Sequence, residues 1–290
     1  MAVLLRLTLV LLLGLASTPL AAVPAWRVSA PEAPGEVLLL GSVHLLRQSH
    51  LPLPAIVERS YAAADRLVME LHPADLEPAA TAAALAQVGI DSPGLRTREL
   101  LGRDGLRELE THARSAGLEP EALARLEPWF VAITLYTGAL AAAGYDPALG
   151  LDQQLGDRAL RDGLPVGGLE TIEQQLGIFK TLAPGTQRDL LHKTLEQLDE
   201  AAAETDLLVA AWLDSDLAAL GLSLEDDFRG YPALRARLVE DRNDAWAPEV
   251  AALLQQEGTA LVVVGALHMV GPGGLPELLR ARGLSVDPLH

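Results

Sequence analysis

The sequence of 290 residues contains no cysteine. Disulfides, thiolate metal ligands, a cysteine nucleophile and a lipid anchor on an N-terminal cysteine are therefore excluded. Basic residues are also scarce, because 22 Lys and Arg stand against 39 Asp and Glu, giving a formal net charge of −17. Non-specific binding of nucleic acid or of anionic lipid needs a basic face. We therefore expect no nucleic-acid partner.

Aromatic residues and long apolar runs are few as well. Aromatics make up only 4% of the chain, which is little for the aromatic platforms of a sugar-binding surface. Beyond the N-terminus, residues 129–144 form the one long apolar run, about sixteen residues against the roughly twenty that span a bilayer. We expect a buried helix there and no membrane span in the mature chain, although a docking surface for a membrane or partner is open. With 50% hydrophobic residues, residues 23–290 can form a single domain with a real core.

The N-terminus has the pattern of a secretory signal peptide. An apolar run over residues 7–15 follows a single positive charge, and the small residues Ala21 and Ala22 follow the run. We predict a signal peptide over residues 1–22 and a periplasmic or secreted protein. An uncleaved segment acting as a membrane anchor is the alternative.

A glycine followed three residues later by a histidine occurs twice, each time directly after an apolar, largely β-branched run. The first copy is Gly41 and His44, and the second is Gly265 and His268. Short apolar runs that end at glycine are typical of the buried strands of parallel sheets. Ligands of such sheets bind just beyond the carboxyl ends of the strands. Both histidines are therefore candidate site residues.

Two further predicted strands carry a carboxylate near the carboxyl end. They are residues 65–71, with Glu70, and residues 163–170, with Glu170. A charged side chain at a buried strand end is costly unless it is paired or binds a metal. For Glu70, an ion pair with an arginine such as Arg242 and a metal-ligand role are both open at this point.

Helical patterns fill most of the rest of the chain. Residues 74–143 predict a large helical insertion packed over the sheet, and residues 232–257 predict one long amphipathic helix. We also expect helices at 52–64, 187–220 and 275–281, a loop at 222–228 and an edge strand at 284–289.

Two acidic residues have a structural explanation at helix starts. Asp152 falls in the first turn of a helix predicted over residues 150–161, where an acid is favoured by the helix dipole. Glu173 lies near the capping-box position of a helix that Thr171 would cap. Spacing alone therefore gives neither acid a catalytic role.

Two imidazoles and one or two carboxylates at strand ends suit a divalent transition metal such as Zn, Mn, Fe or Co. The candidate ligands are His44, Glu70, Glu170 and His268. A bound metal would lower the pKa of a water molecule and polarise a carbonyl, and a second carboxylate would serve as general base. For each of the two histidines, the alternative is a hydrogen-bonded structural role.

The chain also resembles the TraB/GumN family, which includes PrgY and the animal Tiki proteins. The resemblance covers nearly all of the mature chain, in the family's order. It is carried by G-S-V-H (41–44), V-M-E-L (68–71), G-L-D-Q-Q-L (150–155), G-L-E-T-I-E-Q-Q-L (168–176), E-D-R-N-D-A-W (240–246) and V-G-A-L-H-M-V-G-P-G-G-L (264–275).

The resemblance implies an α/β (α+β) fold similar to the erythromycin-esterase-like and haem-binding ChaN-like proteins. In such a fold, many helices flank a central, mostly parallel sheet. The resemblance also implies His44 and His268 as metal ligands or catalytic histidines and Glu70 as ligand or base. Further residues that would line or brace the site are Glu170, Arg242 and Asn243.

Three hypotheses follow. The first is a metal-dependent hydrolase of the cell envelope, similar to Tiki peptidases, acting on a peptide or another small acyl substrate. In it Glu170 orients water or acts as base, and Arg242 or Asn243 stabilises the oxyanion. The second is a non-catalytic haem-, metal- or peptide-binding protein. The third is an accessory of polysaccharide export.

Overall fold

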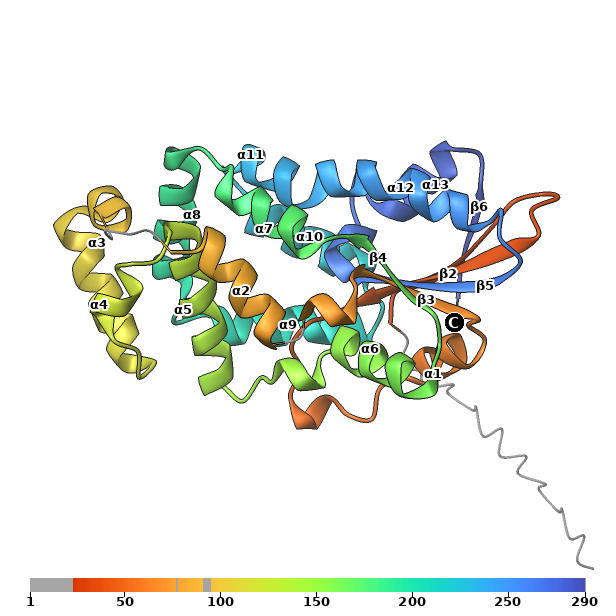
Figure 1. Cartoon of the computed structure of the whole chain (residues 1–290), viewed down its shortest axis with the longest axis horizontal. Coiled ribbons are helices and arrows are strands. Elements are labelled where there is room, and N and C mark those ends of the chain that lie inside the picture. Colours follow the sequence, from red (N-terminus) through yellow and green to blue (C-terminus); the bar gives the residue numbers. More distant parts are fainter. Residues whose placement is uncertain (1–22, 77, 91–94, 290) are drawn as a thin grey trace, which may run out of the picture.

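The computed structural model of the chain describes residues 23–289, apart from residues 77 and 91–94. The predicted signal peptide of residues 1–22 lies outside the described residues. The fold consists of a six-stranded sheet with helices on both faces and a further layer of helices beyond one end of its strands (Figure 1).

The sheet has the strand order β4-β3-β5-β2-β1-β6. Four neighbouring strands are parallel, and β1 is antiparallel to both β2 and β6, which confirms the predicted mostly parallel sheet. The strands are β1 (Ala25–Ser29), β2 (Gly35–Ser42), β3 (Arg66–Leu71), β4 (Val166–Glu170), β5 (Gly258–Gly265) and β6 (Ser285–Pro288).

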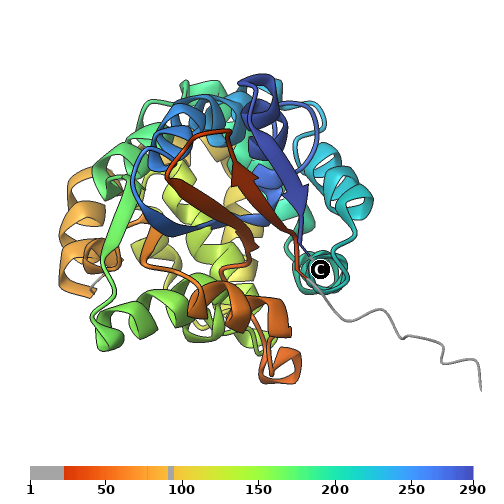
Figure 2. The same cartoon turned by 90° about the vertical axis from the view of Figure 1, so that its right-hand side faces the viewer.

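The central strands are covered on both faces. Leu39 and Leu40 in β2 and Val262 and Val263 in β5 are fully buried, as expected of apolar runs in a parallel sheet. Helices α12 (Asp241–Leu253) and α13 (Leu275–Ala281) lie over one face, and α1 (Ala55–Ala62) and α6 (Leu151–Asp162) lie over the other (Figure 1). Figure 2 shows the strands from the end remote from the helical layer.

The helical layer stands beyond the carboxyl ends of the parallel strands. It consists of α2 (Pro78–Val88), α3 (Leu95–Ser115), α4 (Pro120–Leu123) and α5 (Pro128–Ala142), together with α8 (Pro184–Gln197). Its buried leucines, such as Leu109, Leu135 and Leu191, form a cluster separate from the sheet's core. The helical segment predicted over residues 74–143 is thus joined by a helix from later in the chain.

Three helical predictions need correction. The loop predicted at residues 222–228 is largely helix, because α10 (Leu217–Asp227) buries Leu220 and Leu224 on one face. The stretch 187–220 is divided among α8, α9 (Ala201–Leu213) and α10. The long helix of residues 232–257 comprises α11 (Pro232–Arg235), a π-helical turn (Ala236–Glu240) and α12, and it ends at Leu253.

The capping prediction is half right. Thr171 does cap α7 (Ile172–Lys180), and its hydroxyl accepts a hydrogen bond from the Gln174 backbone N–H. The reciprocal partner is Gln174, whose side chain accepts from the Thr171 N–H at 2.7 Å. Glu173 therefore only adds charge to the first turn.

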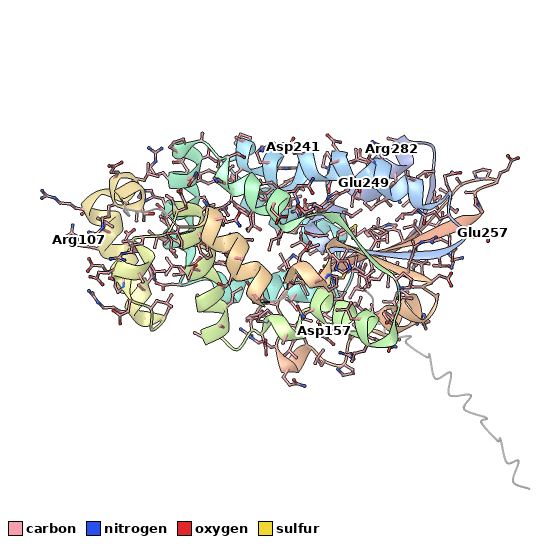
Figure 3. The ribbon with its side chains drawn as sticks, in the orientation of Figure 1. Arg107, Asp157, Asp241, Glu249, Glu257 and Arg282 are labelled. Atoms are coloured by element: carbon pink, nitrogen blue, oxygen red, sulfur yellow. The ribbon has the colours of Figure 1, made fainter. Side chains whose placement is uncertain are left out.

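Most charged side chains lie on the outside of the molecule. Figure 3 shows Arg107, Asp157, Asp241 and Arg282 pointing away from the ribbons. Within the described part of the chain, every helix is too short or too polar to cross a membrane.

Candidate active site at the carboxyl edge of the sheet

The predicted site residues meet where the parallel strands end. Glu70 lies on β3, and the neighbouring strand β5 ends at Gly265, whose backbone N–H donates to Glu70. A Cβ atom at residue 265 would lie 3.3 Å from Glu70 Oε1, 3.6 Å from His268 Cδ2 and 3.7 Å from His44 Nε2. The two histidines and Glu70 therefore converge around Gly265, as the repeated motif predicts.

Arg242, from the start of α12, lies at the centre of this group. Its Nη2 donates to Glu70 Oε2 at 2.5 Å and to Glu170 Oε1 at 2.7 Å. Its Nη1 lies 3.0 Å from His268 Nε2, and its guanidinium stacks over the ring of Trp246, 4.4 Å from the centroid. Of the two roles left open for Glu70, the structure shows the ion pair.

The three charged side chains are almost completely buried. Arg242 is 12% exposed, Glu70 9% and Glu170 8%. Burial opposes ionisation of Glu70, but the charges of Arg242, His268 and His44 and the Gly265 N–H together lower its pKa to about 2. Burial raises the pKa of Glu170 in spite of its bonds from Arg242. Glu70 therefore stays ionised, and Glu170 is protonated more readily than Glu70.

His268 is held as a neutral imidazole with a defined tautomer. Asn243 Nδ2 donates to the backbone carbonyls of His268 and Gly273, so its Oδ1 faces His268 Nδ1 at 2.7 Å. Nδ1 therefore carries the proton, and Nε2 has a lone pair, toward which Arg242 points. Burial lowers the pKa of His268 to about 4. Both the NH₂ group and the oxygen of the Asn243 side-chain amide are used in these bonds, so Asn243 positions His268.

His44 faces open space and is oriented by Asp152. His44 Nδ1 donates to Asp152 Oδ2 at 2.8 Å, while the hydroxyl of Ser42 donates to Asp152 Oδ1 at 2.6 Å. The carboxylate of Asp152 raises the pKa of His44 to about 9. The His44 side chain is 61% exposed, so Nε2, its other ring nitrogen, can reach a ligand.

A cavity of about 340 Å³ lies between the sheet edge and the helical layer. Its polar end is formed by His44, Glu70, Arg242 and Gln175, and Gln175 donates to Glu170. Its remaining walls are apolar: Leu85, Trp129, Phe130, Ile133, Leu176, Ile178, Phe179 and Leu238. The cavity is therefore polar at one end and apolar over the rest of its wall.

The donor set does not fit a metal ion as it is arranged. Within the described ranges, no three His, Asp or Glu side chains are placed to hold one. Arg242 occupies the space between Glu70 and His268, so a cation there would have to displace its guanidinium. The ligand set His44, Glu70 and His268 stays a prediction.

The sequence comparisons confirm the family resemblance. The model of the TraB/PrgY/gumN family matches residues 24–288. The chain belongs to this family. Its relatives include YbaP, an uncharacterized protein of Escherichia coli (strain K12), which is 28% identical over 83% of this chain and 87% of its own length.

Two further relatives of this TraB/PrgY/gumN protein are similar over most of their length. YbaP of Shigella flexneri shows the same 28% identity and coverage, and an uncharacterized protein of Treponema pallidum (strain Nichols) is 25% identical over 89% of this chain and 80% of its own length. No solved structure matches the chain.

Sequence reasoning missed two residues of the site. Asp152 had been explained by the helix start, although it holds His44 from 108 residues away. Gln175, which bonds Glu170, had no role. The family motif that contains Asp152 was the available signal, since a helix-start acid needs no such surroundings.

Proposed function

We propose that this protein is a hydrolase of the cell envelope that cleaves a peptide or another acyl bond, with His44 activating water. The observation that carries the proposal is the His44–Asp152 pair, whose histidine lines the cavity. A carboxylate on Nδ1 orients an imidazole and stabilises its charged form, which is how histidine serves as general base in many hydrolases. The predicted signal peptide would direct the protein to the envelope.

The proposed reaction uses groups already in place. Neutral His44 takes a proton from water through Nε2, and the water oxygen forms a bond to the substrate's carbonyl carbon. The bond to the leaving nitrogen or oxygen then breaks, and His44 returns the proton to the leaving group. Arg242 lines the cavity, and its N–H groups are already bonded to Glu70, Glu170, His268 and the Leu238 carbonyl. It therefore stabilises negative charge on the carbonyl oxygen through its positive charge and without a new hydrogen bond.

The metal-dependent form of this proposal assigns His44, Glu70 and His268 as ligands of Mn, Co or Zn. The side chains that converge on Gly265 support it, and the contacts of Arg242 count against it. Elemental mass spectrometry of the purified chain after incubation with each metal decides whether the protein binds a metal at these residues. One metal per chain in the parent, lost in His44→Ala and in His268→Ala, would establish metal dependence; metal retained in both variants would remove it.

The hydrolase proposal is tested with a panel of peptides, amides and esters. We expect turnover by the parent and a loss of about 100-fold or more in His44→Gln, the usual range for a general base. His112→Gln is the matched control, since His112 lies on α3 in the helical layer. Equal turnover by the parent and His44→Gln would end the proposal.

A further inference from the structure

The cavity next to His44 has a polar end and an apolar remainder. Its four polar residues are Glu70 on β3, His44 after β2, and Arg242 and Gln175, which both bond Glu170 at the end of β4. The other eight of its twelve lining residues are apolar. The apolar residues come from α2, α5, α7 and the π-helical turn before α12. A substrate that reaches His44 therefore places the rest of its bulk against hydrocarbon.

We propose that the substrate carries a large apolar group on the carbonyl side of the bond that is cleaved. This inference rests on the proposed hydrolase function and names its substrate class, an apolar acyl group. The carbonyl would lie against His44 and Arg242, with the hydrocarbon among the helices. The same chemistry is found in a fatty acyl chain and in a peptide residue with a large apolar side chain.

The size of the cavity suits such a group. A cavity of about 150 Å³ accommodates a benzene molecule, and this one has about 340 Å³. Ligand sites are typically lined by apolar side chains, with a few polar groups that fix orientation. A chain of several methylenes or an aromatic side chain would therefore fill a large part of it.

Two features of the wall favour an occupant. Phe130, Ile133 and Phe179 are only partly buried, although each side chain is large and apolar. Trp129 stacks on Phe179 with ring centroids 5.2 Å apart, so the wall also includes a stacked aromatic pair.

The test measures binding and needs no turnover. Methyl ketones reproduce an acyl group but cannot be hydrolysed, so 2-butanone, 2-hexanone and 2-octanone are titrated by ligand-observed NMR. We expect the dissociation constant to fall about fourfold for each added methylene, the value for burying a CH₂ group. The result that overturns the inference is an affinity independent of chain length. Tighter binding of 2-octanone than of 4-phenyl-2-butanone would favour a fatty acyl group, and the reverse order a peptide side chain.

Variants locate the binding. Ile133→Trp fills the cavity from α5 and Leu85→Gln makes its wall polar from α2; each should reduce the affinity for 2-octanone at least tenfold. Leu160→Trp, at a residue 48% exposed on α6, is the control and should bind like the parent. Folding is checked by circular dichroism, and one folded cavity variant is enough to test whether the ketone binds in the cavity. Unchanged affinity in a folded cavity variant contradicts the inference.

The inference and the proposed function fail separately. Chain-length-dependent ketone binding without any turnover would leave the cavity assignment intact and end the hydrolase proposal. Turnover that is as fast on hydrophilic acyl substrates as on apolar ones would leave the hydrolase and end this inference.

Discussion

At the scale of single residues, the site depends on pairs that are far apart in the sequence. His44 meets Asp152, and Glu70 meets Arg242, across 108 and 172 residues. The sequence predicts the histidines and Glu70 because each follows or ends an apolar strand. It does not predict Asp152, because an acid in a first helical turn is stable without any partner. The partner becomes visible only in the fold, where the first turn of α6 meets the end of β2 and the segment after it.

The first prediction concerns the pH dependence of hydrolysis. Asp152 raises the pKa of His44 to about 9, so the neutral, basic form increases as pH rises. We expect kcat/KM to increase with pH up to about 9 in the presence of a chelator. In Asp152→Asn the pKa of His44 should fall toward its ordinary value, which moves the increase to lower pH and lowers the plateau. Identical profiles in the two proteins would show that His44 is not the base.

The second prediction concerns Arg242. Replacing it by Met leaves two buried carboxylates without their partner, and a broken buried ion pair costs about 3–5 kcal/mol. We expect urea unfolding at pH 7 to show a loss of that size in Arg242→Met. The triple variant that adds Glu70→Gln and Glu170→Gln removes the stranded charges and should recover most of it. A loss below about 1 kcal/mol in the single variant would contradict the account of the ion pairs.

At the scale of elements, the approach of α6 to the segment after β2 builds the His44–Asp152 pair. The Leu151 N–H donates to the Val43 carbonyl at 3.0 Å. A Cβ at Gly150 would lie only 2.2 Å from the His44 carbonyl oxygen, whereas its φ of −57° suits any residue. Gly150 is therefore needed for space.

The third prediction follows from this contact. Gly150→Ala should separate α6 from the His44 segment, lower stability by about 1–3 kcal/mol as other overpacked sites do, and reduce hydrolysis by misplacing Asp152. Gly177→Ala in α7 is the matched control, because no atom lies within 4 Å of its added Cβ. We expect the control to be neutral or slightly stabilised, as for Gly→Ala within a helix. Both are measured by thermal unfolding and by turnover; equal effects would refute the argument.

The elements themselves were predictable where hydrophobic patterning is strong. The apolar runs gave β2, β3 and β5, and α13 has the predicted bounds. The first strand was missed because Ala25–Ser29 is short and contains the exposed Arg27. The segment of residues 222–228, predicted as a loop or short turn, is largely helix because burial of Leu220 and Leu224 keeps α10 helical. Tertiary packing, which a local pattern does not contain, decided both cases.

At the scale of the whole molecule, the buried site sets how stability depends on pH. The pKa of His268 is about 4 in the folded protein and near 6.5 when unfolded. As pH falls from 6.5 to 4, the unfolded chain binds a proton that the folded protein does not, so stability decreases. Glu70, lowered from 4.5 to about 2, adds a further loss below pH 4.5. His44 has the opposite sign: its contribution is complete below pH 6.5 and is lost as pH rises through about 9.

The fourth prediction is therefore a maximum in the free energy of unfolding near pH 6.5. Urea titrations from pH 4 to 9.5, with chelator present, should show the decrease between pH 6.5 and 4 in the parent and a flatter curve in His268→Gln. His112→Gln serves as the control and should keep the parent's slope. A parent curve that is flat over this interval would mean that His268 is not held neutral by burial.

The separate hydrophobic cluster of the helical layer has a consequence for how such a protein can change. Three of the eight apolar wall residues of the cavity come from α5, whose Val131, Ala132 and Leu135 pack in this separate cluster. Substitutions on the cavity side of α5 can therefore reshape what fits beside His44 while the core of the sheet stays intact. Substrate selectivity can therefore change in this fold while the residues that carry out the reaction stay the same.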